Sequence, residues 1–274
     1  MWSIGIYKGH SPYHLSPAGN VPNLTGANVT DVTASFVADP FIVRGNPWHM
    51  FFEVWNTDLN KGAVGLAQSH NGFDWKYEQI VLNEPFHLSY PYVFEWQNKY
   101  YMIPETLGAN AACLYQADDF PTRWSLAAKL IEGQCADPSI VRFADRWWLF
   151  ICSTPYQHDT LRLYFADELT GPWREHPKSP IIQNDPCRAR PAGRMLVLDD
   201  KLIRFAQDCV PLYGTRVRAF DILELTTSCY MEVENPASPV LQPSGTGWNA
   251  LGMHHVDAHQ QPDGSWLASV DGLG

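Results

Sequence analysis

The chain has 274 residues, of which 45% are hydrophobic, so it can bury a sizeable core. Its formal net charge of −10 argues against a nucleic-acid partner, which would require a basic surface. It contains no apolar run of about 18 residues, the minimum for a membrane helix, so we expect no membrane span. The first residues show no basic stretch followed by an apolar one, so we also expect no secretory signal.

The six cysteines lie at positions 113, 135, 152, 187, 209 and 229, and no two of them form a Cys-x-x-Cys pair. A zinc ribbon or a redox pair is therefore not expected. Since neither a signal nor a compact cysteine framework is present, we predict six reduced thiols and a cytoplasmic protein.

The predicted elements are short strands separated by turn residues, and no window shows the pattern of an amphipathic helix. The first group of four predicted strands is 39–44, 48–53, 63–69 and a strand that begins at Asp74. Comparable strands follow at 89–94, 100–103, 112–117, 124–126, 136–142, 147–151, 160–166, 202–205, 256–258 and 266–268. The 21 prolines and 19 glycines suit many turns and few helices, so the chain is predicted to be all-β.

The first strand of each group is a repeated segment. Ala38–Arg44 and Ala136–Arg142 differ only at their fourth residue, and weaker copies are Ser89–Phe94, Ala189–Pro191 and Val256–Ala258. The prolines of the first four copies lie at 40, 91, 138 and 191, at intervals of 51, 47 and 53 residues. Periods of this size, filled with short strands, are typical of a β-propeller. We predict one domain, 1–274, folded as a five-bladed propeller with four-stranded antiparallel blades.

The two chain ends are predicted to share the last blade. The fifth copy has only two recognisable strands before Gly274, whereas Trp2–Tyr7 at the start resembles the third strand at Gly62–Ala67. If the N-terminal strand joins the last blade, the ring closes and no long sheet edge stays exposed.

The position before the repeated proline points toward the channel of a propeller. The five copies place these residues there: Asp39, Tyr90, Asp137, Arg190 and Asp257. Charged residues are rarely buried without partners, so a convergent polar site is one interpretation. The other is that the aspartates cap their own turns before proline. We predict Asp39 and Asp137 as catalytic residues, and Tyr90, Arg190 and Asp257 as substrate-binding residues.

A second layer is predicted where the second strand of each blade ends. Its members are Glu53, Glu105, Cys152, Asp208 and Asp271. Glu105 follows the apolar stretch Met102–Pro104, and a carboxyl in apolar surroundings can hold a proton near neutral pH. Glu105 is thus our candidate general acid, although an exposed acid at a strand end would give the same pattern. Glu53, which is closer in sequence to Asp39, has the same standing.

Histidines and arginines supply further candidates. On a strand, His255, Asp257 and His259 project to one face and could hold a single metal ion. They could equally bind sugar hydroxyls or pair with other channel acids. His87 lies near Tyr90 and is predicted to bind substrate, as is His255. The arginines around Arg190 indicate either an anionic group on the ligand or partners for the channel acids.

These residues also carry a family resemblance. The repeated Ala-Asp-Pro with its aromatic strand resembles the five-bladed propellers of the arabinanase, levansucrase and invertase type. The chain is more similar still to the propeller domain of glucosamine inositolphosphorylceramide transferases. The resembling stretches are 38–41, 84–95, 101–106, 190–194 and 252–255.

The resemblance implies cleavage or transfer of a glycosidic bond by carboxyl groups. It assigns the base or nucleophile to Asp39 and the orienting aspartate to Asp137. The family's general acid is a glutamate from a later blade, but the fourth copy here has Arg190. Either Glu105 or Asp257 would then have to donate the proton, or the chain is not a hydrolase. In the transferases a separate glycosyltransferase domain is expected to perform the transfer.

The sequence thus predicts a glycoside hydrolase or transglycosidase that acts on a carbohydrate in the central channel. No cofactor is required by this chemistry, although one metal ion in the channel is compatible with the histidines. The alternative is a non-catalytic carbohydrate-binding propeller that supports a glycosyltransferase. A third hypothesis is a metal-centred propeller that uses His255, Asp257 and His259.

Overall fold

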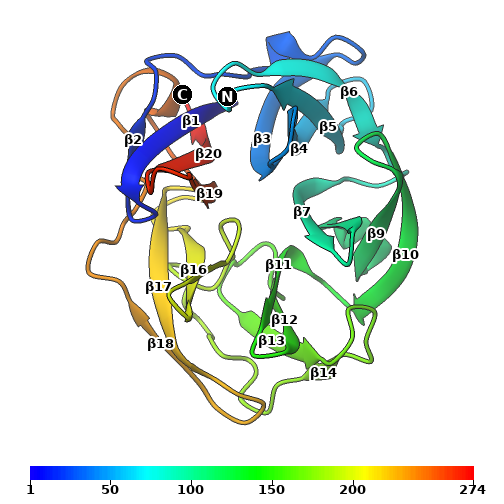
Figure 1. Cartoon of the computed structure of the whole chain (residues 1–274), viewed down its shortest axis with the longest axis vertical. Helices are drawn as coiled ribbons and strands as arrows, with labels where there is room; N and C mark the ends of the chain where they lie inside the picture. Colours follow the sequence, from blue (N-terminus) through cyan, green and yellow to red (C-terminus); the bar gives the residue numbers. More distant parts are fainter.

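The computed structural model describes residues 1–274 and shows five four-stranded antiparallel sheets arranged in a ring (Figure 1). Blade 1 comprises β3 (Ala34–Val43), β4 (Trp48–Asn56), β5 (Lys61–Ser69) and β6 (Lys76–Leu82). Blade 2 comprises β7 (Ser89–Trp96), β8 (Lys99–Glu105), β9 (Ala111–Asp119) and β10 (Arg123–Glu132). Blade 3 comprises β11 (Ala136–Phe143), β12 (Arg146–Cys152), β13 (Leu161–Ala166) and β14 (Arg174–Glu175).

Blade 4 comprises β15 (Leu196–Leu198), β16 (Lys201–Asp208), β17 (Arg216–Leu225) and β18 (Tyr230–Glu234). Blade 5 comprises β19 (Val256–Gln260), β20 (Trp266–Leu273), β1 (Trp2–Ser11) and β2 (His14–Pro17). The only helical segments are three short 3₁₀ turns at Gly26–Asn28, Leu107–Ala109 and Gly247–Asn249. None of them has the length and apolarity that a membrane crossing requires. No disulfide joins the six cysteines.

The predicted fold class and the predicted ring closure are both confirmed. The N-terminal strand β1 pairs antiparallel with the C-terminal strand β20, from Trp2 opposite Leu273 to Gly9 opposite Trp266. The amino group of Met1 also contacts the carbonyl oxygen of Gly274, and the two ends lie side by side in Figure 1. Because the two ends pair, β20 is not left as an edge strand, and blade 5 has four strands like the other blades.

The core consists of five hydrophobic clusters, one at each interface between neighbouring blades. Successive side chains of a strand point to opposite faces of its sheet, so each inner strand serves two interfaces. On β4, for example, Phe51 packs toward blade 2 and Phe52 toward blade 5. Burial of each such side chain contributes about 1.5–3 kcal/mol. Packing between the blades therefore fixes the ring, and with it the residues at its centre.

The innermost strand of blade 4 differs from the prediction. It contains only Leu196–Leu198, and the predicted start at Arg190–Pro191 lies before it in irregular structure. Pro191 still forms an isolated antiparallel bridge to Ala206 of β16. The next residues extend across the channel, where Gly193 forms a parallel bridge to Val256 of blade 5 and bonds the Tyr90 hydroxyl of blade 2. Gly193 has a φ of +124°, and a Cβ there would lie 1.9 Å from the carbonyl oxygen of Val256. Only glycine permits this approach.

Candidate functional site

Three blades carry the same backbone irregularity at the channel. Asp39, Tyr90 and Asp137 have φ values of 52°, 48° and 45°, although none is glycine and each precedes a proline. In each case the register between the first and second strands shifts at this point, as in a β-bulge. A non-glycine residue held at positive φ costs of order 1–3 kcal/mol and needs support from its surroundings.

Carboxylates of neighbouring blades supply that support. The backbone N–H of Asp39 donates to Oδ2 of Asp271 at 3.1 Å, and that of Tyr90 donates to Oδ2 of Asp39 at 3.2 Å. The N–H of Asp137 donates to Oε2 of Glu105 at 3.3 Å. Each acceptor comes from the preceding blade in the ring. The two layers predicted from sequence are thus connected directly by hydrogen bonds.

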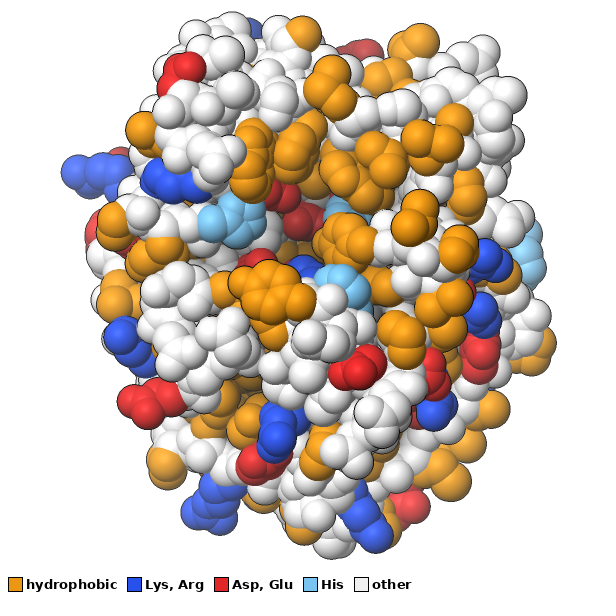
Figure 2. Space-filling model, turned by 180° about the vertical axis from the view of Figure 1, so that it is seen from behind, with side chains coloured by type: hydrophobic (Ala, Val, Ile, Leu, Met, Phe, Trp, Pro, Cys, Tyr) orange, Lys and Arg blue, Asp and Glu red, His pale blue; other side chains and the backbone are white.

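The acids surround a polar pit near the centre of one face of the ring. Figure 2 shows this hollow, in which acidic, basic and histidine side chains gather within a surround of hydrophobic side chains. The buried charged residues at this end of the channel are Asp39, Glu53, Glu105, Asp137, Arg190, His254 and Asp271. Charged groups at this density are unusual in an interior and indicate a functional site.

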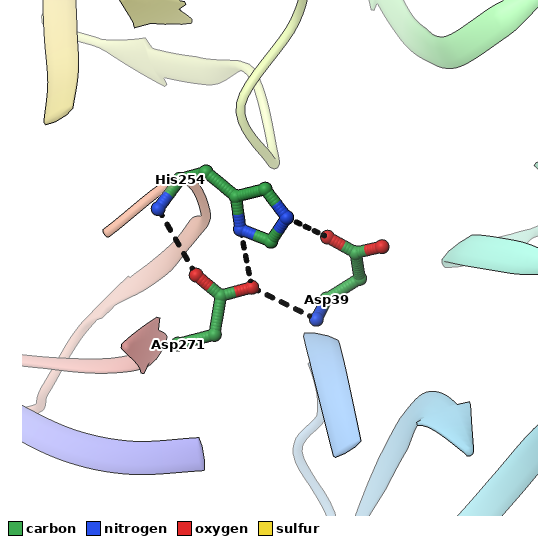
Figure 3. Close-up of side chains that lie close together, drawn as sticks. All are labelled: Asp39, His254 and Asp271. Carbon is green, nitrogen blue, oxygen red and sulfur yellow. Dashed lines mark hydrogen bonds and ion pairs between the residues drawn. The ribbon is translucent and has the colours of Figure 1, made fainter. Parts of the chain in front are cut away.

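Asp39, His254 and Asp271 form a connected row (Figure 3). Nδ1 of His254 lies 2.7 Å from Oδ2 of Asp271, and its Nε2 lies 3.8 Å from Oδ1 of Asp39. The imidazole also stacks on Trp2, with ring centroids 4.0 Å apart. Burial opposes its charge, but Asp271 and Asp39 raise the pKa of His254 above its usual value. The two carboxyl groups therefore favour the cationic form of the histidine.

The two carboxyls of this row differ in their proton affinity. Burial raises the pKa of Asp39 to about 7, the His254 cation opposes this rise, and Asp271 and Asp137 add to it. Burial also acts on Asp271, yet His254 and backbone N–H donors lower the pKa of that carboxyl. Asp271 is consequently a fixed anion, while Asp39 can exchange a proton near neutral pH.

Arg190 binds two of the remaining acids. Its Nε lies 2.6 Å from Oδ2 of Asp137, and its Nη2 lies 3.1 Å from Oε2 of Glu105. The amide of Gln207 also donates to Oδ2 of Asp137, at 2.7 Å. The sequence left two roles open for this arginine, and the structure shows it paired with the channel acids. Its guanidinium also lies over the ring of Tyr213, 5.0 Å from the centroid.

Two glutamates of the pit hold protons more strongly than an ordinary carboxyl. Burial raises the pKa of Glu105 to about 8, with Arg190 acting against the rise and Asp137 adding to it. Burial also raises the pKa of Glu53 well above its usual value, and Asp39 and Glu105 strengthen the effect. Both can therefore be protonated at neutral pH, which is what a general acid requires.

The structure places the predicted substrate-binding residues in two groups. His87 and Arg190 lie at the pit, and the side chain of His87 is 34% exposed. Tyr90, His255 and Asp257 are instead fully buried. The Tyr90 hydroxyl accepts the N–H of Gly193 at 2.6 Å and lies 2.7 Å from Oγ of Ser139. Tyr90 thus holds the segment that crosses the channel and is not accessible to a ligand.

Asp257 belongs to a separate ion cluster. Its Oδ1 lies 2.6 Å from Nε of Arg194, and its Oδ2 lies 2.8 Å from Nε2 of His259. The backbone N–H of Ile42 donates to the same Oδ2. Arg194 and His259 overcome burial and hold the pKa of Asp257 well below its usual range. This cluster ties blade 5 to blade 1 and to the segment that crosses the channel.

The predicted metal set does not converge. His259 contacts Asp257, whereas Nε2 of His255 lies 3.0 Å from the carbonyl oxygen of Pro40. The residues whose candidate ligand atoms do gather, all within 4.8 Å of one another, are Asp39, His254 and Asp271. Their ligand atoms already bind each other and three backbone N–H groups, those of Asp39, His254 and His255.

The predicted second layer included Asp271 but gave it no role, and His254 was not assigned to the site. Asp271 occupies the same position of the repeat as Glu53 and Glu105. His254 precedes β19 by two residues and has no counterpart in the other copies of the repeat. Only the pairing of the two chain ends brings it beside Asp39.

Comparison with known proteins places the chain in a family. Residues 1–273 match the family described as "Glucosamine inositolphosphorylceramide transferase 1, N-terminal". The chain is 35% identical to glucosamine inositolphosphorylceramide transferase 1 of Oryza sativa subsp. japonica over 297 aligned positions, which cover 99% of this chain and 40% of that protein. The same transferase of Arabidopsis thaliana is 33% identical and is covered over 39% of its length. The chain thus spans well under half of these relatives.

Solved structures with the same fold include glycoside hydrolases. An exo-β-1,3-galactanase from Clostridium thermocellum superimposes with a TM-score of 0.65 at 12% identity, covering 80% of this chain and 52% of that one. A thermostable family-43 glycoside hydrolase superimposes with a TM-score of 0.62 at 13% identity, covering 89% of this chain and 91% of that one. A family 117 glycoside hydrolase from Zobellia galactanivorans superimposes with a TM-score of 0.57 at 13% identity, covering 86% of this chain and 84% of that one. Identities this low establish the fold alone, whereas the match over residues 1–273 shows that this chain belongs to the glucosamine inositolphosphorylceramide transferase 1 N-terminal family.

Proposed function

We propose that the pit cleaves or transfers a glycosidic bond, with Asp39 as the general base. The observation that carries this proposal is the set of carboxyl groups with different proton affinities. Asp39, with a pKa of about 7, lies in one small pit with Glu53 and Glu105, whose pKa values are also raised. An acid and a base with separately tuned pKa values are what glycoside cleavage needs.

The proposed step balances without a cofactor. Asp39 takes a proton from water, and the water oxygen bonds to the anomeric carbon while the bond from that carbon to the glycosidic oxygen breaks. A protonated glutamate of the pit gives its proton to the departing oxygen, so two hydroxyl products form. In transfer, a sugar hydroxyl takes the place of water.

The residues around Asp39 have supporting roles in this proposal. The His254 cation, fixed by Asp271, stabilises the ionised form of Asp39 and orients it. Asp137 is held by Arg190 and Gln207, and it supports the site as a fixed carboxylate. Trp55, which stacks on Phe36 with centroids 5.6 Å apart, offers an aromatic face beside His87 for a sugar ring.

A carbohydrate-binding module is the second candidate. The observation that favours it is the Arg190 fork, which binds both Asp137 and Glu105 and occupies the place of an acid on blade 4. The curated relatives bear the name of a transferase and are more than twice as long as the matched region. In that case the propeller would present a glycan to the remainder of such a protein.

Both candidates can be separated with one panel of glycosides. Sugar release and binding are measured on the same panel for the wild-type chain and for Asp39→Asn, with the exposed Asp119→Asn as the matched control. We expect release by the wild type and by the control, and a loss of about 10²–10⁴-fold in Asp39→Asn with binding retained. Binding without release by the wild type would identify a binding module, and absence of both would contradict both candidates.

A further inference from the structure

The two glutamates of the pit differ in what their carboxyl oxygens contact. Oε2 of Glu105 accepts from Nη2 of Arg190 at 3.1 Å and from the backbone N–H of Asp137 at 3.3 Å. Donors of this kind favour the ionised form of a carboxyl. The carboxyl of Glu53, on β4, accepts no hydrogen bond in the structure, and the basic side chain beside it is that of His87.

His87 is aimed at Glu53 by its own hydrogen bond. The backbone N–H of Gly62 donates to Nδ1 of His87 at 2.8 Å, so the hydrogen of the neutral ring is on Nε2. That nitrogen lies 3.7 Å from Oε1 of Glu53. Burial lowers the pKa of His87, which keeps the ring neutral. A neutral donor beside Oε1 orients the carboxyl without forcing its ionisation, and it leaves Oε2 to carry the proton.

A glycine makes this approach sterically feasible. A Cβ at position 62 would lie 2.9 Å from Oε1 of Glu53, 2.8 Å from Cε1 of His87 and 2.2 Å from the carbonyl oxygen of Leu88. These contacts are too short for any larger residue, so Gly62 is required for the histidine to reach the glutamate. The pair is therefore a built arrangement and not a chance contact at the surface.

Glu53 is also placed correctly relative to the proposed base. In the ladder between β3 and β4, Glu53 is opposite Ala38, the residue before Asp39. Both side chains thus come from the same blade, on adjacent strands, and both are buried at the pit. The four charged neighbours that act most strongly on the pKa of Glu53 are all carboxyls, and they oppose its ionised form.

We infer that Glu53, oriented by His87, is the group that donates a proton to the leaving oxygen, and that Glu105 is a structural partner of Arg190. This inference rests on the proposed function and corrects the assignment of Glu105 expected from sequence. The proton moves from Oε2 of Glu53 to the glycosidic oxygen as the bond to the anomeric carbon breaks. His87 is a positioning residue in this scheme and does not itself touch the substrate.

Leaving-group dependence provides the test. For a sugar that the wild type accepts, 2,4-dinitrophenyl and methyl glycosides are compared, since dinitrophenolate departs without protonation whereas methanol does not. We expect Glu53→Gln to lose about 10²–10⁴-fold on the methyl glycoside and to stay near wild type on the dinitrophenyl glycoside. His87→Phe should show the same selectivity in weaker form. Glu105→Gln should lose activity equally on both, and the exposed Glu78→Gln on neither.

The outcomes test the assignment of the proton donor separately from the proposed function. An equal loss of Glu53→Gln on both glycosides, or a selective loss of Glu105→Gln on the methyl glycoside, would overturn the donor assignment while glycoside cleavage stands. A wild-type chain that cleaves no dinitrophenyl glycoside of the panel would overturn both. Thermal unfolding of each variant shows whether a loss reflects misfolding, and the dinitrophenyl activity of Glu53→Gln provides the same control within the assay.

Discussion

Nε of Arg190 on blade 4 lies 2.6 Å from Oδ2 of Asp137 on blade 3, and both side chains are buried. Both residues occupy the same position of the repeat, immediately before a proline. Arg190 lies before the regular inner strand of its blade. It supplies a buried positive charge to a pit in which most of the buried charged side chains are acidic. The stability and the chemistry of the pit therefore depend on this pair.

Loss of the arginine should be costly. Arg190→Met leaves Asp137 and Glu105 buried without their cation, and we expect the free energy of unfolding to fall by about 3–5 kcal/mol. The double variant Arg190→Met/Asp137→Asn should recover part of this loss because one uncompensated charge is gone. Urea denaturation measures both, with the exposed Arg123→Met as a control. Equal stability of Arg190→Met and the control would contradict the account.

Removal of the central histidine should shift the pH dependence of activity. The His254 cation lowers the proton affinity of Asp39, so His254→Gln should raise the pKa of that carboxyl further. A base works only when deprotonated, and activity should therefore rise with pH at a higher pH than in the wild type. The acidic limb of a plot of kcat/KM against pH measures the pH at which activity rises. An unchanged limb, or one displaced to lower pH, would show that His254 does not act on the base.

The ionised form of Asp39 should reduce the stability of the folded state. Its folded pKa of about 7 lies above its ordinary value, so the folded state loses stability as pH rises through that interval. We expect Asp39→Asn to raise the free energy of unfolding at pH ~8 by about 1–3 kcal/mol, and to change it little near pH ~4. Denaturation at both values, with Asp119→Asn as control, checks the sign. A destabilised variant at the higher pH would refute it.

We predict that this chemistry requires no metal ion. The atoms of Asp39, His254 and Asp271 that could bind one already bind each other and backbone N–H groups. We expect dialysis against EDTA to leave the thermal midpoint and the sugar release unchanged. Elemental analysis before and after dialysis completes the test. A stoichiometric metal whose removal lowers either quantity would assign the cluster to an ion.

The sequence predicts the ring because its signal is local and repeated. Ala-Asp-Pro followed by an aromatic strand marks the start of a blade, and the resemblance of Trp2–Tyr7 to a third strand predicts the closure by β1. The same repeat predicts that Asp39 and Asp137 share one level of the channel, where both adopt the same bulge. Periodicity thus specifies which residues are equivalent.

The contacts between blades could not be predicted from that periodicity. Asp271 binds the backbone of Asp39 across 232 residues of chain, and no local pattern encodes this pairing. The position in the repeat also does not distinguish a residue that a ligand can reach from one that is fully buried. Asp257 occupies the position equivalent to Asp39, yet it lies in an ion cluster with Arg194. The proline spacing suggested a regular fourth copy, but the crossing segment at Gly193 displaces its inner strand.

The most direct test of the central claim is a crystal structure of Asp39→Asn with an uncleaved glycoside. The account predicts that the glycoside occupies the pit, with its anomeric carbon facing residue 39 through one water and its glycosidic oxygen within hydrogen-bonding distance of Glu53. A glycoside bound on the outer surface of the blades, with the pit empty of sugar, would contradict it.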